Sequence, residues 1–191
     1  VSPDYSKRKK TNLMLSACTA LFSMNLINSI HWRFVSEREI ISEDVYSLMK
    51  LFGHVACVGI LPEAMYYYCQ NDTSLTRTYR KDRYEGIKAF YDQVLILCEN
   101  LKYPEVIRTR FASVYLAFVI ATLKLIVLSN DDFPEKIRNI KRIEKDLHLK
   151  KVLSKIDLKI ESKSRKLIRM TILSKNTFLC YFLLVLRYKY I

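Results

Sequence analysis

The feature that most restricts the fold is the stretch from residue 105 to residue 128, which contains no glycine or proline. Pro104 stands immediately before it, where proline favours the start of an α-helix. Val114 to Leu128 is apolar apart from Lys124 and a few small polar side chains. A transmembrane helix needs about 20 apolar residues, and Arg110 and Lys124 interrupt this stretch. We therefore expect a buried helix of a folded domain.

The rest of the chain is also poor in turn-forming residues. Of its 191 residues only 3 are Gly and 4 are Pro, and half are hydrophobic. Such a composition excludes disordered and collagen-like chains and favours helix over a many-stranded sheet. Its 5 cysteines lie mostly within apolar runs and form no CxxC motif, which predicts buried, reduced thiols in a reducing compartment such as the cytoplasm.

Helical periodicity and end signals recur along the chain. A short helix is expected near 24–30, and a second from Ser42 as N-cap to Gly53, with Val45, Leu48, Met49 and Phe52 on its buried face. Ile87, Tyr91, Val94, Leu95 and Cys98 mark one face of a longer helix that ends before Pro104. Pro134 opens another helix, and basic helical segments continue to the C-terminus.

Three short apolar segments interrupt this helical pattern. Residues 30–35, 55–61 and 65–69 have the length and bulky side chains of strands. We therefore expect an α/β fragment over residues 1–78, with few short strands, followed by a mainly α-helical basic region over 79–191. The chain as a whole should be predominantly helical.

Positive charge is concentrated at the C-terminal end. The formal net charge is +13, and residues 135–191 carry 16 Lys or Arg against 5 Asp or Glu. Basic residues at helical spacing beside apolar sequence indicate that 150–191 could dock on an anionic membrane surface. A solvated lysine-rich surface is the alternative. Nucleic acid is disfavoured as a partner, because no nucleic-acid-binding motif accompanies the charge.

Several motifs of the N-terminal region occur in a specific order. They are Leu21-Phe22 through Ile27, Phe34, Glu43-Asp44, the segment Glu63-Ala64-Met65-Tyr66-Tyr67-Tyr68, and Ser74-Leu75-Thr76. These motifs, in this order, resemble the second half of a bacterial family 2 glycosyltransferase with the GT-A fold. The resemblance covers residues 12–80. That resemblance implies an inverting transfer of a sugar from a nucleotide-sugar donor to a hydroxyl acceptor, as in polysaccharide biosynthesis.

The resemblance also implies roles for individual residues. Asp44 would be the general base that takes the proton of the acceptor hydroxyl, with Glu43 beside it. The candidate substrate-binding residues are Trp32, Tyr66, Tyr68 and Ser74. Two alternatives stay open. Both acids could only cap a helix, and Trp32 could pack in the core.

The sequence also departs from the family pattern. Cys69 and Asn71 stand where the family has cationic residues for the departing diphosphate, and Ala64 replaces a proline. The DxD motif and the nucleotide-binding strands belong to the preceding half of such enzymes, so we expect no cofactor in this chain and Mg²⁺ or Mn²⁺ only with that half. The three histidines share no metal-ligand spacing. The alternative function is a non-catalytic helical module that binds an anionic membrane or a partner protein through its basic tail.

Overall fold

The computed structural model describes residues 16–61, 63, 65–67, 69, 79–156 and 161–189, which form eight α-helices, one 3₁₀ turn and no β-strand. The chain is therefore predominantly helical, as predicted. The helices are α1 (Met24–Ser29), α2 (Glu43–Phe52), α3 (Arg83–Asn100), α4 (Glu105–Leu128), α5 (Phe133–Lys145), α6 (Leu147–Leu153), α7 (Lys163–Leu173) and α8 (Thr177–Lys189), and the 3₁₀ turn is Ala17–Thr19.

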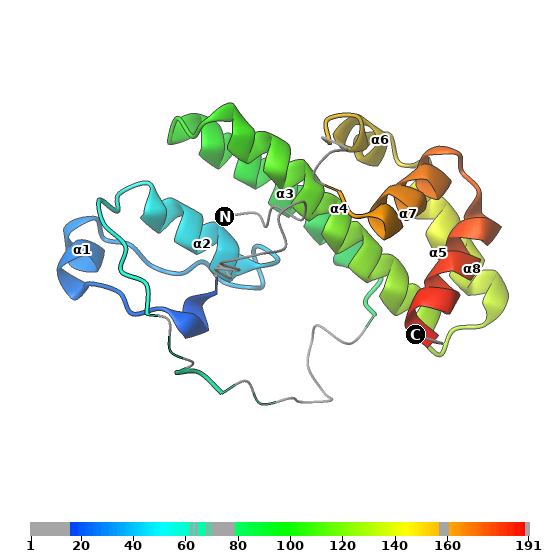
Figure 1. Cartoon of the computed structure of the whole chain (residues 1–191), viewed down its shortest axis with the longest axis horizontal. Coiled ribbons are helices and arrows are strands. Elements are labelled where there is room, and N and C mark those ends of the chain that lie inside the picture. Colours follow the sequence, from blue (N-terminus) through cyan, green and yellow to red (C-terminus); the bar gives the residue numbers. More distant parts are fainter. Residues whose placement is uncertain are drawn as a thin grey trace.

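Helix α4 organises the structure. It packs against α3, α5, α6 and α8, and in Figure 1 the α3–α4 hairpin runs through the middle of the molecule with α5 to α8 on one side and α1 and α2 on the other. Helix α4 begins at Glu105 after Pro104 and ends at Leu128, as its sequence predicts. The predicted apolar face of α3 is confirmed at its buried residues Ile87, Tyr91, Val94 and Cys98, whereas Leu95 is only partly buried.

Helix α4 is long and apolar enough to cross a bilayer, with a mean hydropathy of 2.3 over its most apolar window. However, 67% of that window is buried inside the protein, since the helix forms the centre of the main core. Leu116, Val119, Leu123 and Ile126 are 0% exposed. Helix α4 therefore has the surroundings of a core helix, as we expected.

The strand predicted at 30–35 is wrong. This segment instead leaves α1 and lies across α2. The N–H groups of Ile30, His31 and Trp32 donate to carbonyls of α1, and two further polar groups contact a single residue of α2. The indole Nε1–H of Trp32 donates to the Ser47 carbonyl at 2.8 Å, and the Val35 N–H donates to the Ser47 hydroxyl at 3.0 Å. A strand needs a neighbouring strand to pair with its backbone, and here two helices satisfy those groups.

The strands predicted at 55–61 and 65–69 are also wrong for the residues that the structure describes. These residues are irregular, and the apolar side chains expected to be buried face outward. Val58 is 58% exposed, Ile60 57% and Leu61 67%. The α/β part of the predicted fold is therefore not formed here. These apolar runs were therefore wrongly predicted to be buried, paired strands.

Two glycines allow α2 and the segment before it to approach the α3–α4 hairpin. A Cβ on Gly86 of α3 would lie 2.3 Å from Cδ1 of Ile41, and a Cβ on Gly53 would lie 2.8 Å from Cδ1 of Leu101. The Tyr103 hydroxyl also donates to the Met49 carbonyl at 2.8 Å. The N-terminal region is thus packed directly on the helical region.

Asp146 joins three helices and is the subject of a stability prediction. Its carboxylate caps α6 by accepting from the N–H groups of His148 at 2.7 Å and Leu149 at 3.3 Å. It also pairs with Lys88 of α3 at 2.9 Å. Asp146→Ala should therefore cost about 2 kcal/mol in the free energy of unfolding, measured with urea. Asp82→Ala is the matched control, because Asp82 stands at the N-cap of α3 without a capping bond.

The effect of Asp146 should depend on pH. Partial burial disfavours its charge, but Lys88 and the two backbone donors outweigh burial and hold the pKa of Asp146 below its ordinary value of 3.8. A lowered folded pKa contributes stability that is present above 3.8 and is lost as pH falls through the folded pKa. The difference between wild type and Asp146→Ala should therefore be full at neutral pH and shrink in acid. An equal difference at all pH values would contradict this account of the ion pair.

Candidate functional site

The acidic pair Glu43-Asp44 occupies the first turn of α2, as predicted. Ser42 stands at the N-cap position, but its side chain makes no capping hydrogen bond and its backbone is left-handed, with φ 57° and ψ 48°. A non-glycine residue in this conformation costs about 1–2 kcal/mol, and such strain clusters at functional sites. The Asp44 carboxylate accepts from the Val45 N–H at 2.7 Å.

The start of α2 concentrates negative charge. Partial burial raises the pKa of Glu43, and the carboxylates of Asp44 and Glu37 raise it further, although backbone donors at the helix start act against them. Glu43 is therefore an acid whose ionised form is disfavoured by its surroundings.

The raised pKa of Glu43 gives a pH prediction for Glu43→Gln. Because the folded pKa of Glu43 is raised above 4.5, its stabilising contribution is present below that value and is lost as pH rises through the folded pKa. The Gln variant should melt at a slightly higher temperature than wild type at neutral pH, and the difference should disappear in acid. A lower melting temperature at neutral pH would show that Glu43 is held by favourable contacts of its charge.

Trp32 lies in a small core beneath the same helix. The side chain is 7% exposed and packs with Leu48 and Leu51 of α2. The ring of Phe34 stands edge-on to it, with centroids 4.5 Å apart. Trp32 therefore meets α2 one turn beyond Asp44, through its bond to Ser47. The structure places Trp32 against the helix that carries Glu43 and Asp44, where its bond to Ser47 holds that helix.

The other candidates belong to the Tyr-rich segment. Tyr66 is 50% exposed, and Tyr67 is 85% exposed. Tyr68 and Ser74 lie outside the described residues, as does Asn71. Cys69 is exposed. The two described tyrosines thus offer aromatic rings to a ligand or to another surface.

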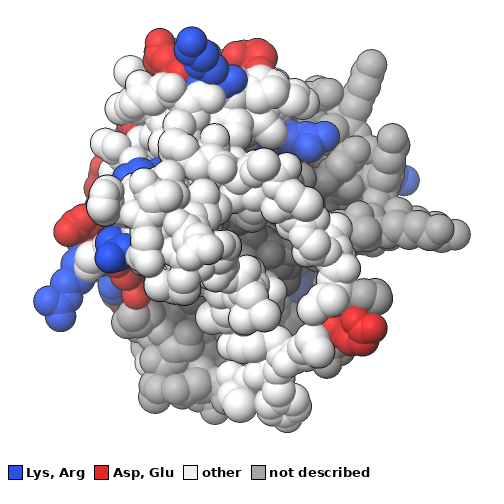
Figure 2. Space-filling model, turned by 90° about the vertical axis from the view of Figure 1, so that its left-hand side faces the viewer, with Lys and Arg blue, Asp and Glu red and all other residues white. Residues whose placement is uncertain are grey.

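Residues 21–67 expose many large apolar side chains besides these tyrosines. We use "the apolar face" for the large exposed side chains of residues 21–67, namely Leu21, Met24, Phe34, Val58, Ile60, Leu61, Met65, Tyr66 and Tyr67. Figure 2 views the molecule from this side, and uncharged side chains occupy most of the view, with charged residues chiefly near its edge. Three cysteines predicted to be buried, Cys18, Cys57 and Cys69, are also exposed in this region. Exposed apolar patches of this extent mark contact surfaces.

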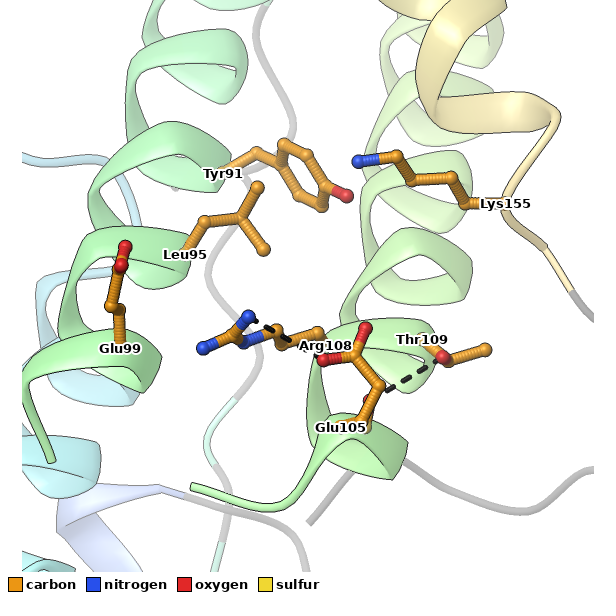
Figure 3. A pocket seen from close by; sticks show the side chains of 7 residues that line it. All are labelled: Tyr91, Leu95, Glu99, Glu105, Arg108, Thr109 and Lys155. Atoms are coloured by element: carbon orange, nitrogen blue, oxygen red, sulfur yellow. Dashed lines mark hydrogen bonds and ion pairs between the residues drawn. The ribbon is translucent and has the colours of Figure 1, made fainter. Parts of the chain in front are cut away.

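A hollow lies in the helical region, between α3, the start of α4 and the end of α6 (Figure 3). The cavity measures about 420 Å³ and is lined by Tyr91, Leu95, Glu99, Glu105, Arg108, Thr109 and Lys155. Arg108 pairs with Glu105 at 3.4 Å, and two acids balance two bases around the hollow. This balance gives the hollow no selectivity for a charged ligand.

A partly exposed polar network joins α3, α4 and α6 and could not be predicted from the sequence. The Tyr115 hydroxyl lies 3.1 Å from Nδ1 of His148, and Nε2 of His148 lies 3.0 Å from Asp92. Burial raises the pKa of Tyr115 well above its ordinary value, so its hydroxyl stays protonated. The two bonded pairs are 33 and 56 positions apart in sequence, so no local motif could indicate them. With its phenol protonated, the network serves as a link between helices.

No group of three His, Cys, Asp or Glu side chains that could hold a metal ion occurs among the described residues. Comparison of the chain with protein-family models, curated proteins and solved structures gives no match.

Proposed function

We propose that this chain is the acceptor-side part of a sugar transferase similar to the family 2 glycosyltransferases. It would move a sugar from a nucleotide diphosphate to a hydroxyl acceptor with inversion. The proposal rests on the order of motifs from Leu21-Phe22 to Ser74-Leu75-Thr76, with Glu43-Asp44 between them.

The placement of Asp44 supports the role of general base. An acceptor hydroxyl loses its proton as its oxygen attacks the anomeric carbon, so a carboxylate must lie within hydrogen-bond reach of it. Asp44 lies in the first turn of α2, at the positive end of the helix dipole. Glu43 beside it would position Asp44 or contact the acceptor.

Trp32 and the tyrosines would build the acceptor site around this base. We propose that Trp32 acts through its bond to Ser47, by fixing the start of α2. Tyr66 and Tyr68 would contact the acceptor sugar, whose ring stacks well on aromatic faces, and Ser74 would donate to a substrate oxygen.

The apolar face is the observation that carries the proposal furthest. Leu21 is 98% exposed, Met65 77% and Tyr67 85%, and leaving such side chains in water forfeits about 1.5–3 kcal/mol each. We propose that the nucleotide-binding half of the transferase covers this face and completes the site beside Asp44. Any Mg²⁺ or Mn²⁺ that accompanies the donor diphosphate would be held by that half, and none of the roles given to residues of this chain depends on it.

The proposed location is the cytoplasm, where nucleotide sugars are made available to such enzymes, with the protein peripheral to the inner face of the plasma membrane. The net charge of +11 over residues 135–191 supports this location, because the cytoplasmic leaflet is anionic.

The proposal is tested by assaying the polypeptide as the cell makes it. The protein, purified from its native host together with anything that co-purifies, is incubated with a panel of nucleotide sugars and a cell extract as the source of acceptors. Release of nucleoside diphosphate that depends on the extract is expected for one donor. Folded protein that releases none with any donor would contradict the proposal.

A further inference from the structure

Helix α8 presents an uninterrupted apolar surface to solvent. Phe178 is 65% exposed, Leu179 42%, Phe182 56% and Leu186 40%. At 100° per residue these four positions fall on one side of the helix, and Cys180 and Leu184 on the opposite side are 0% exposed. We call the four exposed residues the α8 stripe. A surface helix of a soluble domain ordinarily carries polar residues on this side.

The buried side of α8 is fixed firmly in the fold. Thr177, at its start, donates to the buried carboxylate of Glu144 on α5. The helix also packs against α4, α5 and α7. Phe133 of α5, itself 50% exposed, extends the stripe, since its ring centroid lies 6.4 Å from that of Phe178. The stripe is therefore a fixed part of the surface of the folded protein.

Cations lie near both ends of helix α8. Near its start, Lys141 and Lys175 line the same cavity of about 440 Å³ as Phe178. Lys150 lies close to Lys175, since partial desolvation and this like charge lower the pKa of Lys150. No carboxylate pairs with these three lysines among the residues that the structure describes.

At the other end, the ammonium of Lys124 lies 4.9 Å from the centroid of the Tyr188 ring, and Arg187 lies over the same ring at 5.2 Å. Residues 162–189 contain no Asp or Glu at all. On α7, Lys163 and Met170 are both exposed and share one side of the helix. Helices α7 and α8 therefore carry cations and no acid, and the Glu144 carboxylate that Thr177 contacts is buried.

We propose that the α8 stripe is the surface by which this protein docks on an anionic phospholipid bilayer. The four apolar side chains would enter the boundary between headgroups and acyl chains, and the flanking lysines would contact the phosphates. Helix α8 has 13 residues, which span about 20 Å and cannot cross a hydrocarbon core of about 30 Å. It would therefore lie in the plane of the interface.

The lysines beside the α8 stripe favour an anionic membrane over a second copy of this chain or a nucleic acid as the partner. A second copy of this chain would bring the same lysines into opposition, and nucleic acid would leave two phenylalanines and two leucines without apolar contact. A bilayer with anionic headgroups satisfies both features. This inference rests on the peripheral location proposed above and names the surface responsible for it. Vesicle binding is measured without any sugar donor. A negative binding result would therefore leave the proposal of sugar transfer untouched.

The experiment is co-sedimentation of the full chain with phosphatidylcholine vesicles and with vesicles that also contain phosphatidylglycerol. The wild type should bind the anionic vesicles at low salt and release them in part at high salt. The double variant Phe178→Ser/Phe182→Ser should bind at least tenfold more weakly. Lys141→Gln/Lys175→Gln should lose about fivefold or more on anionic vesicles only.

Matched controls come from elsewhere on the surface. Leu147→Ser alters an apolar side chain that is 78% exposed at the start of α6, and Lys50→Gln/Lys102→Gln removes two exposed lysines outside the region. Both should bind as wild type, and every variant should keep the wild-type circular dichroism spectrum. Absence of wild-type binding at low salt, or equal binding by the stripe variant, would overturn the proposal. So would a concentration-dependent dimer that the stripe variant abolishes while vesicle binding persists.

Discussion

Asp44→Asn should lower kcat for sugar transfer by about 100-fold or more, while melting temperature and donor affinity stay close to those of the wild type. The substitution keeps the size of the side chain and its bond to the Val45 N–H, but an amide cannot take the proton of the acceptor hydroxyl. General-base catalysis contributes typically about 10²–10⁴-fold. The measurement is nucleoside diphosphate release in the assay defined above.

The matched control for this variant is Asp82→Asn. Asp82 also stands at a helix start, with no capping bond and with its side chain 77% exposed, so its substitution should leave kcat unchanged. Equal activity of Asp44→Asn and wild type would remove Asp44 from the mechanism. A parallel loss of kcat and of melting temperature would instead assign Asp44 the purely structural role of stabilising the start of α2.

Leu123→Ala should lower the free energy of unfolding by about 2–5 kcal/mol. Leu123 is 0% exposed at the centre of α4, which packs against four other helices, so truncation leaves a cavity that its neighbours cannot fill. A typical domain has a total stability of about 5–15 kcal/mol, so this variant should be close to unfolding. Urea denaturation followed by circular dichroism measures the change.

Leu147→Ala provides the comparison, because the same side chain is truncated where it is 78% exposed. Its cost should stay within about 0.5 kcal/mol. This pair of variants also tests the surroundings of α4. A loss below about 1 kcal/mol at Leu123 would contradict a tightly packed protein core around the helix and would favour a looser or lipid-facing position.

The helices could be predicted because their signals are local. The apolar spacing of α3 and the Pro104 start of α4 lie within single segments, and both helices were confirmed with their buried faces. Pro134 likewise predicted the start of a helix, and α5 begins there, at Phe133. The structure shows that Asp132 caps α5 by accepting from the Glu135 N–H at 2.8 Å.

The failures concern contacts between distant segments. An apolar run such as 55–61 has the same composition whether it pairs in a sheet or faces outward, so sequence could not distinguish them. The close approach of Ile41 to Gly86 depends on the absence of a Cβ more than 40 residues away. Of the candidate site, the position of Glu43-Asp44 at a helix start was predictable, whereas the burial of Trp32 beneath that helix depended on Ser47.

The measurement that tests the central claim most directly is the genomic sequence immediately upstream of the codon for Val1. If residues 12–80 are the acceptor-side part of a family 2-like transferase, the reading frame or its neighbour should encode a Rossmann-like nucleotide-binding half with a DxD motif. That half would supply the surface that covers Leu21, Met65 and Tyr67. A start codon at Val1 with no such coding sequence nearby would contradict the enzymatic proposal.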